Sequence, residues 1–216
     1  MAENNYDLIH ATVNKIAISP EDAHDLVSGY FKQSPYGKSD SRSRELVAKK
    51  IINRYAKLAA TSGGATSLTS VVPGIGTAVS LVGGGAADVA ITMKLQVDMT
   101  MCLAAAYGYD LTNEDARHLS FMIAGVGALE QLATTTGKDF VSKSAIKMTN
   151  IYLKGATLTA VKDVFKYVGI NFTKKALQKS IPFGVGVVIG SASNYALSKY
   201  VGSQALEWFI LNPNNV

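Results

Sequence analysis

Two apolar, glycine-rich segments constrain the fold of this chain more than any other feature of its sequence. They span residues 72–87 and 181–192, and in each a proline follows an apolar residue and precedes alternating glycines and small residues. A glycine inside a helix costs about 1 kcal/mol relative to alanine, so such segments need closely packed helices or a lipid environment. We therefore predict two apolar helical hairpins in pseudo-repeat that pack in the core. Insertion of these hairpins into lipid is the alternative.

The composition favours a helical protein. The 216 residues suffice for a full core, 48% of them are apolar, and only 17% are charged, which is below the usual quarter. Five prolines and few alternating β-branched residues argue against a sheet protein. We predict an all-α fold, a compact multi-helix bundle.

Capping residues predict where several helices begin and end. Ser19 followed by Pro20 is typical of a helix start, and this helix should end near residue 32. A long helix is predicted over 76–107, where Gly108 would stop it. A closing helix is expected over 193–211.

Residues 41–60 predict an amphipathic helix. Its apolar positions recur at helical spacing, and basic residues occupy the rest of its circumference. The apolar positions are Val47, Ile51, Tyr55 and Leu58. The helix either docks on the core with a solvated basic face or lies on a membrane surface.

The distribution of charge predicts two parts. Residues 1–40 hold six acidic residues against three lysines, and a polar stretch with proline and glycine at 34–41 marks a boundary with the rest of the chain. We predict an acidic helical appendage over 1–40 and a helical domain over 41–216.

Lysines dominate the second half of the chain. Ten lysines and no arginine lie between residues 138 and 199, against two aspartates. Because lysine is a point charge without a bidentate fork, this pattern suits a diffuse anionic surface. We predict that a lysine-rich face binds anionic phospholipid membranes or an acidic protein partner. Its residues are Lys143, Lys147, Lys154, Lys162, Lys166, Lys174, Lys175 and Lys179.

Three charged residues interrupt the apolar helix predicted over 76–107. Lys94 and Asp98 are four residues apart and can pair, whereas Asp88 is flanked by small and apolar residues. A buried carboxylate must be paired, hydrogen-bonded or protonated. We predict a buried polar site at Asp88, Lys94 and Asp98, and for Asp88 a structural helix–helix contact is the simpler interpretation.

The sequence contains no recognisable catalytic or metal-binding pattern. Its three histidines are scattered, and Cys102, the single cysteine, lies in an apolar helical stretch where a buried thiol is expected. Neither Gly-x-Gly pair follows a strand signal or precedes Gly-Lys-Ser/Thr, which excludes a P-loop. No nucleic-acid-binding motif occurs either. We expect no enzymatic activity, no cofactor and no nucleic-acid partner.

The order of these features resembles the EcsC protein family. The resemblance implies an all-helical bacterial protein whose activity is poorly defined, and it transfers no catalytic residues. It covers about 41–211, which leaves 1–40 outside. The residues that carry it are 73–76, 87–89, 106–111, 181–186, 193–196 and 205–209.

These observations favour a cytoplasmic protein that associates peripherally with membranes, because the polar, acidic N-terminus lacks the features of a signal peptide. Two alternatives remain. One is a pore-forming or membrane-inserting effector that uses the glycine-rich hairpins, and the other is a soluble scaffold that binds an acidic protein.

Overall fold

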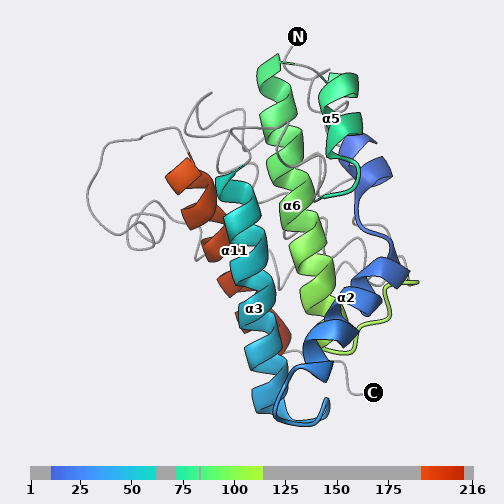
Figure 1. Cartoon of the computed structure of the whole chain (residues 1–216), viewed down its shortest axis with the longest axis vertical. Coiled ribbons are helices and arrows are strands. Elements are labelled where there is room, and N and C mark those ends of the chain that lie inside the picture. The colour runs from blue at the N-terminus through green and yellow to red at the C-terminus, as the bar shows by residue number, and fades with distance from the viewer. Residues whose placement is uncertain (1–10, 62–71, 83, 114–190, 212–216) are drawn as a thin grey trace.

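The structure is a computed structural model that describes residues 11–61, 72–82, 84–113 and 191–211. These residues are predominantly helical and contain no strand, which confirms the predicted all-α fold. Figure 1 shows that the helices run roughly along one long axis, with α2 crossing the lower part obliquely.

The first two labelled helices begin and end where the sequence predicts. Helix α2 spans Pro20–Lys32, and the Ser19 hydroxyl caps it by accepting the Asp22 N–H at 3.0 Å. Helix α3 spans Ser41–Ala60, and its N-cap Asp40 accepts the Arg42 N–H at 2.8 Å. Both caps satisfy a backbone donor that the first helical turn leaves unpaired.

The single long helix predicted over 76–107 is wrong. The structure has two helices here, α5 at Ile75–Val82 and α6 at Gly84–Ala106, which pack against each other. The division falls at the three consecutive glycines 83–85, where helix propensity is lowest. Of the second glycine-rich segment, 181–190 lies outside the described residues, so the pseudo-repeat stays a prediction.

The approach to α5 depends on a glycine. Gly74 has φ +85°, a left-handed conformation that other residues rarely adopt. A Cβ atom at this position would also lie 2.9 Å from the Ile16 Cβ. The N-terminal segment therefore packs directly on this turn.

Helix α6 is the centre of the described structure. Every residue from 90 to 107 is buried, and α2, α3, α5 and α11 all contact the helix (Figure 1). It ends as predicted at Gly108, which has φ +85°. The Tyr109 N–H bonds to the Ala104 carbonyl at 3.0 Å and the Gly108 N–H to the Ala105 carbonyl at 3.1 Å, the pattern of a Schellman motif.

Helix α11 spans Ser191–Leu211, two residues longer at its start than predicted. It runs in the same direction as α6 and opposite to α3 (Figure 1). Gly202 brings the three helices together, since a Cβ atom there would lie 2.9 Å from Ile52 and from the Met99 sulfur. Farther along, Phe209 stacks on Tyr107 with ring centroids 6.1 Å apart.

Among the described helices, none combines the length and the apolar content needed to cross a bilayer.

Candidate functional site

The predicted site residues fall into three groups in the structure. The eight lysines from Lys143 to Lys179 lie outside the described residues, so the lysine-rich face stays a prediction. Asp88 lies on α6, but its side chain is not among those that the structure describes. Lys94 and Asp98 are both described, and the structure brings them together.

The apolar side of α3 is docked on the core. Val47, Ile51 and Tyr55 are buried, and α3 packs against α6 and α11. Leu58 is partly buried against the same cluster. Of the two interpretations of this helix, core docking with a solvated basic face is the one the structure shows. The apolar side is therefore occupied by protein.

Basic side chains remain on the outer side of α3. Lys50, Arg54 and Lys57 are exposed at i, i+4 and i+7, and none of them pairs with an acid among the described residues. We call these three residues the α3 basic face. Beside it, the Lys199 ammonium of α11 donates to the Asn53 side-chain oxygen at 2.7 Å.

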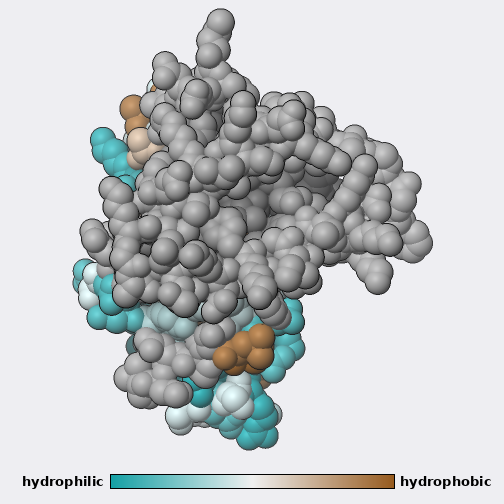
Figure 2. All heavy atoms as spheres, turned by 180° about the vertical axis from the view of Figure 1, so that it is seen from behind, coloured by the Kyte–Doolittle hydropathy of each residue, from teal (hydrophilic) through white to brown (hydrophobic). Residues whose placement is uncertain are grey.

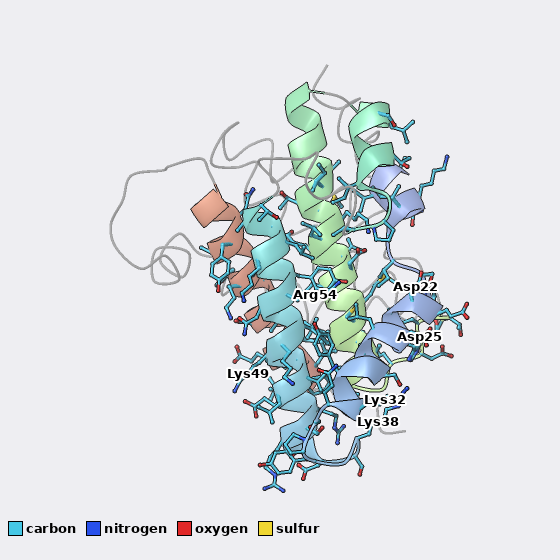
Figure 3. The ribbon with its side chains drawn as sticks, in the orientation of Figure 1. Asp22, Asp25, Lys32, Lys38, Lys49 and Arg54 are labelled. Atoms are coloured by element: carbon cyan, nitrogen blue, oxygen red, sulfur yellow. The ribbon has the colours of Figure 1, made fainter. Side chains whose placement is uncertain are left out.

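Basic side chains lie on both sides of the described structure, and Figure 3 labels Lys32 and Lys38 near the acidic residues of α2. Figure 3 places Asp22 and Asp25 of α2 at one edge, whereas Lys49 of α3 lies at the opposite edge. Lys49 is paired with Glu45 at 2.6 Å, an exposed contact that contributes little to stability. Because the α3 basic face has no acidic partner among the described residues, the outer side of α3 is positively charged.

A buried ion pair lies inside α6. The Lys94 ammonium contacts the Asp98 carboxylate at 2.5 Å, and the two side chains are only 2% and 4% exposed. This confirms the pairing predicted from their spacing. The other Asp98 oxygen accepts the Ile18 N–H at 2.8 Å. Asp98 thereby ties the segment between residue 16 and α2 to the central helix.

Opposing effects act on the pKa of Asp98. Burial raises it, whereas the Lys94 ammonium and the Ile18 N–H lower it, and the pKa remains above its ordinary value. Both charges are compensated and neither is open to solvent. The observed arrangement of Lys94 and Asp98 is a structural contact, whereas the helix–helix contact expected of Asp88 stays a prediction.

A buried tyrosine–cysteine contact lies one helical turn beyond the Lys94–Asp98 pair. The Tyr55 hydroxyl lies 3.6 Å from the Cys102 sulfur, and Cys102 follows Asp98 by four residues on α6. Burial raises the pKa of the Cys102 thiol to about 12 and that of Tyr55 well above its ordinary value. The thiol is therefore buried, as predicted, and protonated at neutral pH.

Three buried polar side chains carry no hydrogen bond within the described part of the chain. They are Thr92 and Gln96 of α6 and Ser198 of α11. These three residues were not predicted from the sequence, although Thr92, Gln96 and the buried Thr100 recur every four positions on α6. No group of three metal-ligating side chains gathers in residues 11–61, 72–82, 84–113 and 191–211.

The comparison with protein families agrees with this helical architecture. The EcsC protein family model matches residues 9–209, and the chain therefore belongs to the EcsC protein family. The match begins before residue 41, so it includes α2 as well as the later helices. Neither the curated proteins nor the solved structures compared with the chain gave a match.

Proposed function

We propose that this protein is a non-enzymatic helical module that associates peripherally with anionic membrane surfaces. The observation that carries the proposal is the orientation of α3. Its apolar side is buried against α6 and α11, while Lys50, Arg54 and Lys57 are exposed without acidic partners in the described structure.

Because the apolar side of α3 is buried in protein, it is not available to contact a membrane. A helix that lies in a membrane interface buries its apolar face among the lipids, but α3 has already buried that face in protein. Binding through this helix is therefore electrostatic. The eight lysines from Lys143 to Lys179 would add to the same attraction.

The size of the attraction follows from the charges. Each basic residue near an anionic membrane contributes about 1 kcal/mol, and salt screens the contribution over about 8 Å at physiological ionic strength. The α3 basic face alone would therefore change affinity by about 100-fold at low salt. Binding should rise with the anionic lipid content and fall with salt.

Sedimentation of the protein with vesicles of graded phosphatidylglycerol content tests this proposal. We expect binding that increases with phosphatidylglycerol and is lost at high salt. Equal binding to neutral and anionic vesicles would refute the electrostatic mechanism. Salt-resistant binding with dye leakage would favour insertion of the glycine-rich segments, and no binding at any composition would favour an acidic protein partner.

A further inference from the structure

Three polar side chains of α6 and α11 are buried without a hydrogen-bond partner among the described residues. They are Thr92, Gln96 and Ser198, and none of them is more than 1% exposed. In Gln96 both the side-chain oxygen and the side-chain nitrogen are unpaired. Buried polar groups in folded proteins are almost always hydrogen-bonded, because an unpaired group costs its full desolvation energy. These three side chains therefore require a polar partner.

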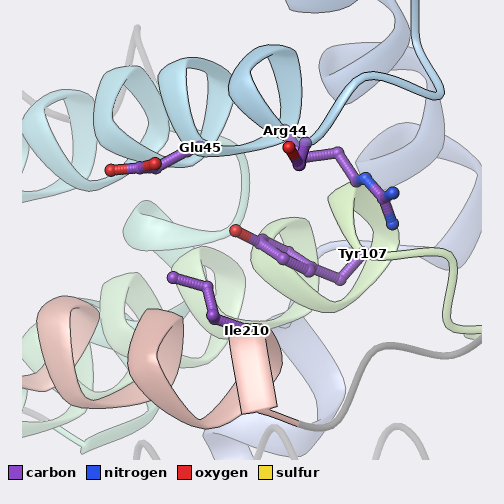
Figure 4. Close-up of a pocket in the computed structure, with 5 residues that line it drawn as sticks. Arg44, Glu45, Tyr107 and Ile210 are labelled. Atoms are coloured by element: carbon purple, nitrogen blue, oxygen red, sulfur yellow. The ribbon is translucent and has the colours of Figure 1, made fainter.

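The stacked rings of Tyr107 and Phe209 fix the alignment of α6 with α11. Figure 4 shows the end of α6, with Tyr107, beside the end of α11. Tyr107 continues the helical geometry, because its N–H donates to the Leu103 carbonyl at 3.1 Å. The two helices run in the same direction (Figure 1). Eleven residues make about three turns of an α-helix, so the residues eleven positions before the stacked pair share its face on each helix. These residues are Gln96 and Ser198.

A second contact between α6 and α11 lies close to these two residues. A Cβ atom on Gly202 would lie 2.9 Å from the Met99 sulfur. Gly202 follows Ser198 by four positions and Met99 follows Gln96 by three, so each shares a helix face with its polar neighbour. Gln96 and Ser198 therefore face each other across the contact surface of the two helices, which we call the α6–α11 seam. Thr92 lies one turn before Gln96 on the same face of α6.

Helix α11 departs from the usual distribution of polar and apolar side chains. It buries the hydroxyl of Ser198, whereas Ile210 and Leu211 at its end are 49% and 62% exposed. Figure 2 shows an apolar patch at this end of the described structure. A buried serine adds little apolar surface to a helix contact. Its position opposite a buried glutamine therefore points to a polar contact inside the seam.

We propose that the α6–α11 seam binds a structural water molecule that bridges Gln96 and Ser198. Water offers two donors and two acceptors, and the amide and the hydroxyl each offer both kinds of group. Buried waters typically make about three hydrogen bonds, and the Thr92 hydroxyl supplies the third. The close packing one turn away, at Gly202, restricts the site to a molecule of this size. The water joins α11 to α6 by hydrogen bonds, independently of any contact made by the α3 basic face.

A crystal structure of the full chain, at a resolution that shows ordered waters, tests the site directly. We expect electron density for a water molecule within hydrogen-bond distance of both Gln96 and Ser198. The same density should be absent from the double variant Gln96→Met/Ser198→Ala. A direct hydrogen bond between the two side chains, or a seam without a water molecule at this point, would overturn the proposal.

Stability in solution provides a test that does not depend on crystals. Gln96→Met keeps the length of the side chain and removes both of its polar groups, which leaves the water and Ser198 short of a partner. We expect the equilibrium constant for unfolding, measured by urea denaturation, to rise about threefold to tenfold. Gln33→Met is the matched control, because Gln33 is exposed at the end of α2. It should leave the constant nearly unchanged. A fall in the constant for Gln96→Met would overturn the proposal, because it would show that the amide is buried unpaired.

A double-variant cycle tests whether Gln96 and Ser198 hold the same water. Ser198→Ala alone should also raise the unfolding constant, because it leaves the water with one partner fewer. In Gln96→Met/Ser198→Ala the water is lost together with both groups, so the rise should be smaller than the product of the two single rises. A rise equal to that product would show that the two residues act independently, and the shared site would then be wrong.

Discussion

The Lys94–Asp98 pair illustrates what a sequence can reveal about single residues. Their spacing of four positions predicts the contact, because such residues share one helix face. The third partner, the Ile18 N–H, is 80 positions from Asp98. Likewise, Cys102 is 47 positions from Tyr55. Local periodicity carries no information about such distant contacts, so the sequence predicted the pair but not its surroundings.

Removal of one partner from this buried pair should be costly. Asp98→Asn leaves the Lys94 ammonium buried without a counter-charge and weakens the bond to Ile18. We expect the free energy of unfolding to fall by about 3–5 kcal/mol, measured by urea denaturation. The double variant Lys94→Met/Asp98→Leu removes both charges and should be considerably more stable than Asp98→Asn. A single-variant loss below about 1 kcal/mol would contradict the assignment of a buried ion pair.

The buried thiol predicts a specific pH dependence. The Cys102 pKa is about 12 in the folded state and about 8.5 in an unfolded chain. Above pH 9 the unfolded state loses a proton that the folded state keeps, so stability falls as pH rises. For this group the slope is about 1.4 kcal/mol per pH unit between pH 9 and 12.

Cys102→Ala removes this contribution. Its free energy of unfolding should therefore decrease less steeply with pH than that of the wild-type protein, as measured by urea denaturation between pH 8 and 10.5. Parallel pH profiles of the two proteins would show that the thiol is not protected by burial.

At the scale of elements, local signals predicted helix ends well where capping chemistry is strong. Ser19 with Pro20 and Gly108 with its positive φ fixed two helix ends. The division between α5 and α6 was not predicted, because the apolar character of 76–107 favours one continuous helix, whereas glycines 83–85 disfavour it. The length of a helix depends both on its apolar residues and on the conformational cost of its glycines. Here the cost of the glycines prevails and the helix is divided.

Two glycine substitutions test how tightly the helices pack. Gly202→Ala places a Cβ atom 2.9 Å from Ile52 and Met99, so we expect a loss of about 1–3 kcal/mol in the free energy of unfolding from overpacking. Gly29→Ala is the control, because nothing lies within 4 Å of its added Cβ. It should stabilise α2 by about 0.5–1 kcal/mol. If both variants were stabilised, the close contact of α3, α6 and α11 would be wrong.

At the scale of the whole molecule, one helix organises the described structure. Helix α6 is buried over residues 90–106, and α2, α3, α5 and α11 all pack around it. The sequence predicted the all-α class from composition and periodicity. It did not predict that α6 would be central, because a helix apolar on all sides has no preferred face and its neighbours are set by tertiary packing.

The same arrangement determines where charge accumulates. Asp22 and Asp25 of α2 lie on the other side of the described structure from Lys49 of α3, although Lys32 and Lys38 lie near these two aspartates (Figure 3). The α3 basic face was visible in the sequence as a cluster of arginines and lysines. Its exposure depends on the docking of the apolar side of α3 on α6 and α11, which the sequence alone does not reveal.

The most direct test of the central claim compares two triple variants in the vesicle assay at low salt. Lys50→Gln/Arg54→Gln/Lys57→Gln removes the α3 basic face, and Lys15→Gln/Lys32→Gln/Lys38→Gln removes three exposed charges elsewhere. Both change the net charge equally. We predict that the first weakens binding to phosphatidylglycerol vesicles by about 100-fold, whereas the second has a much smaller effect. Equal loss in both variants, or no loss in the first, would contradict membrane association through this face.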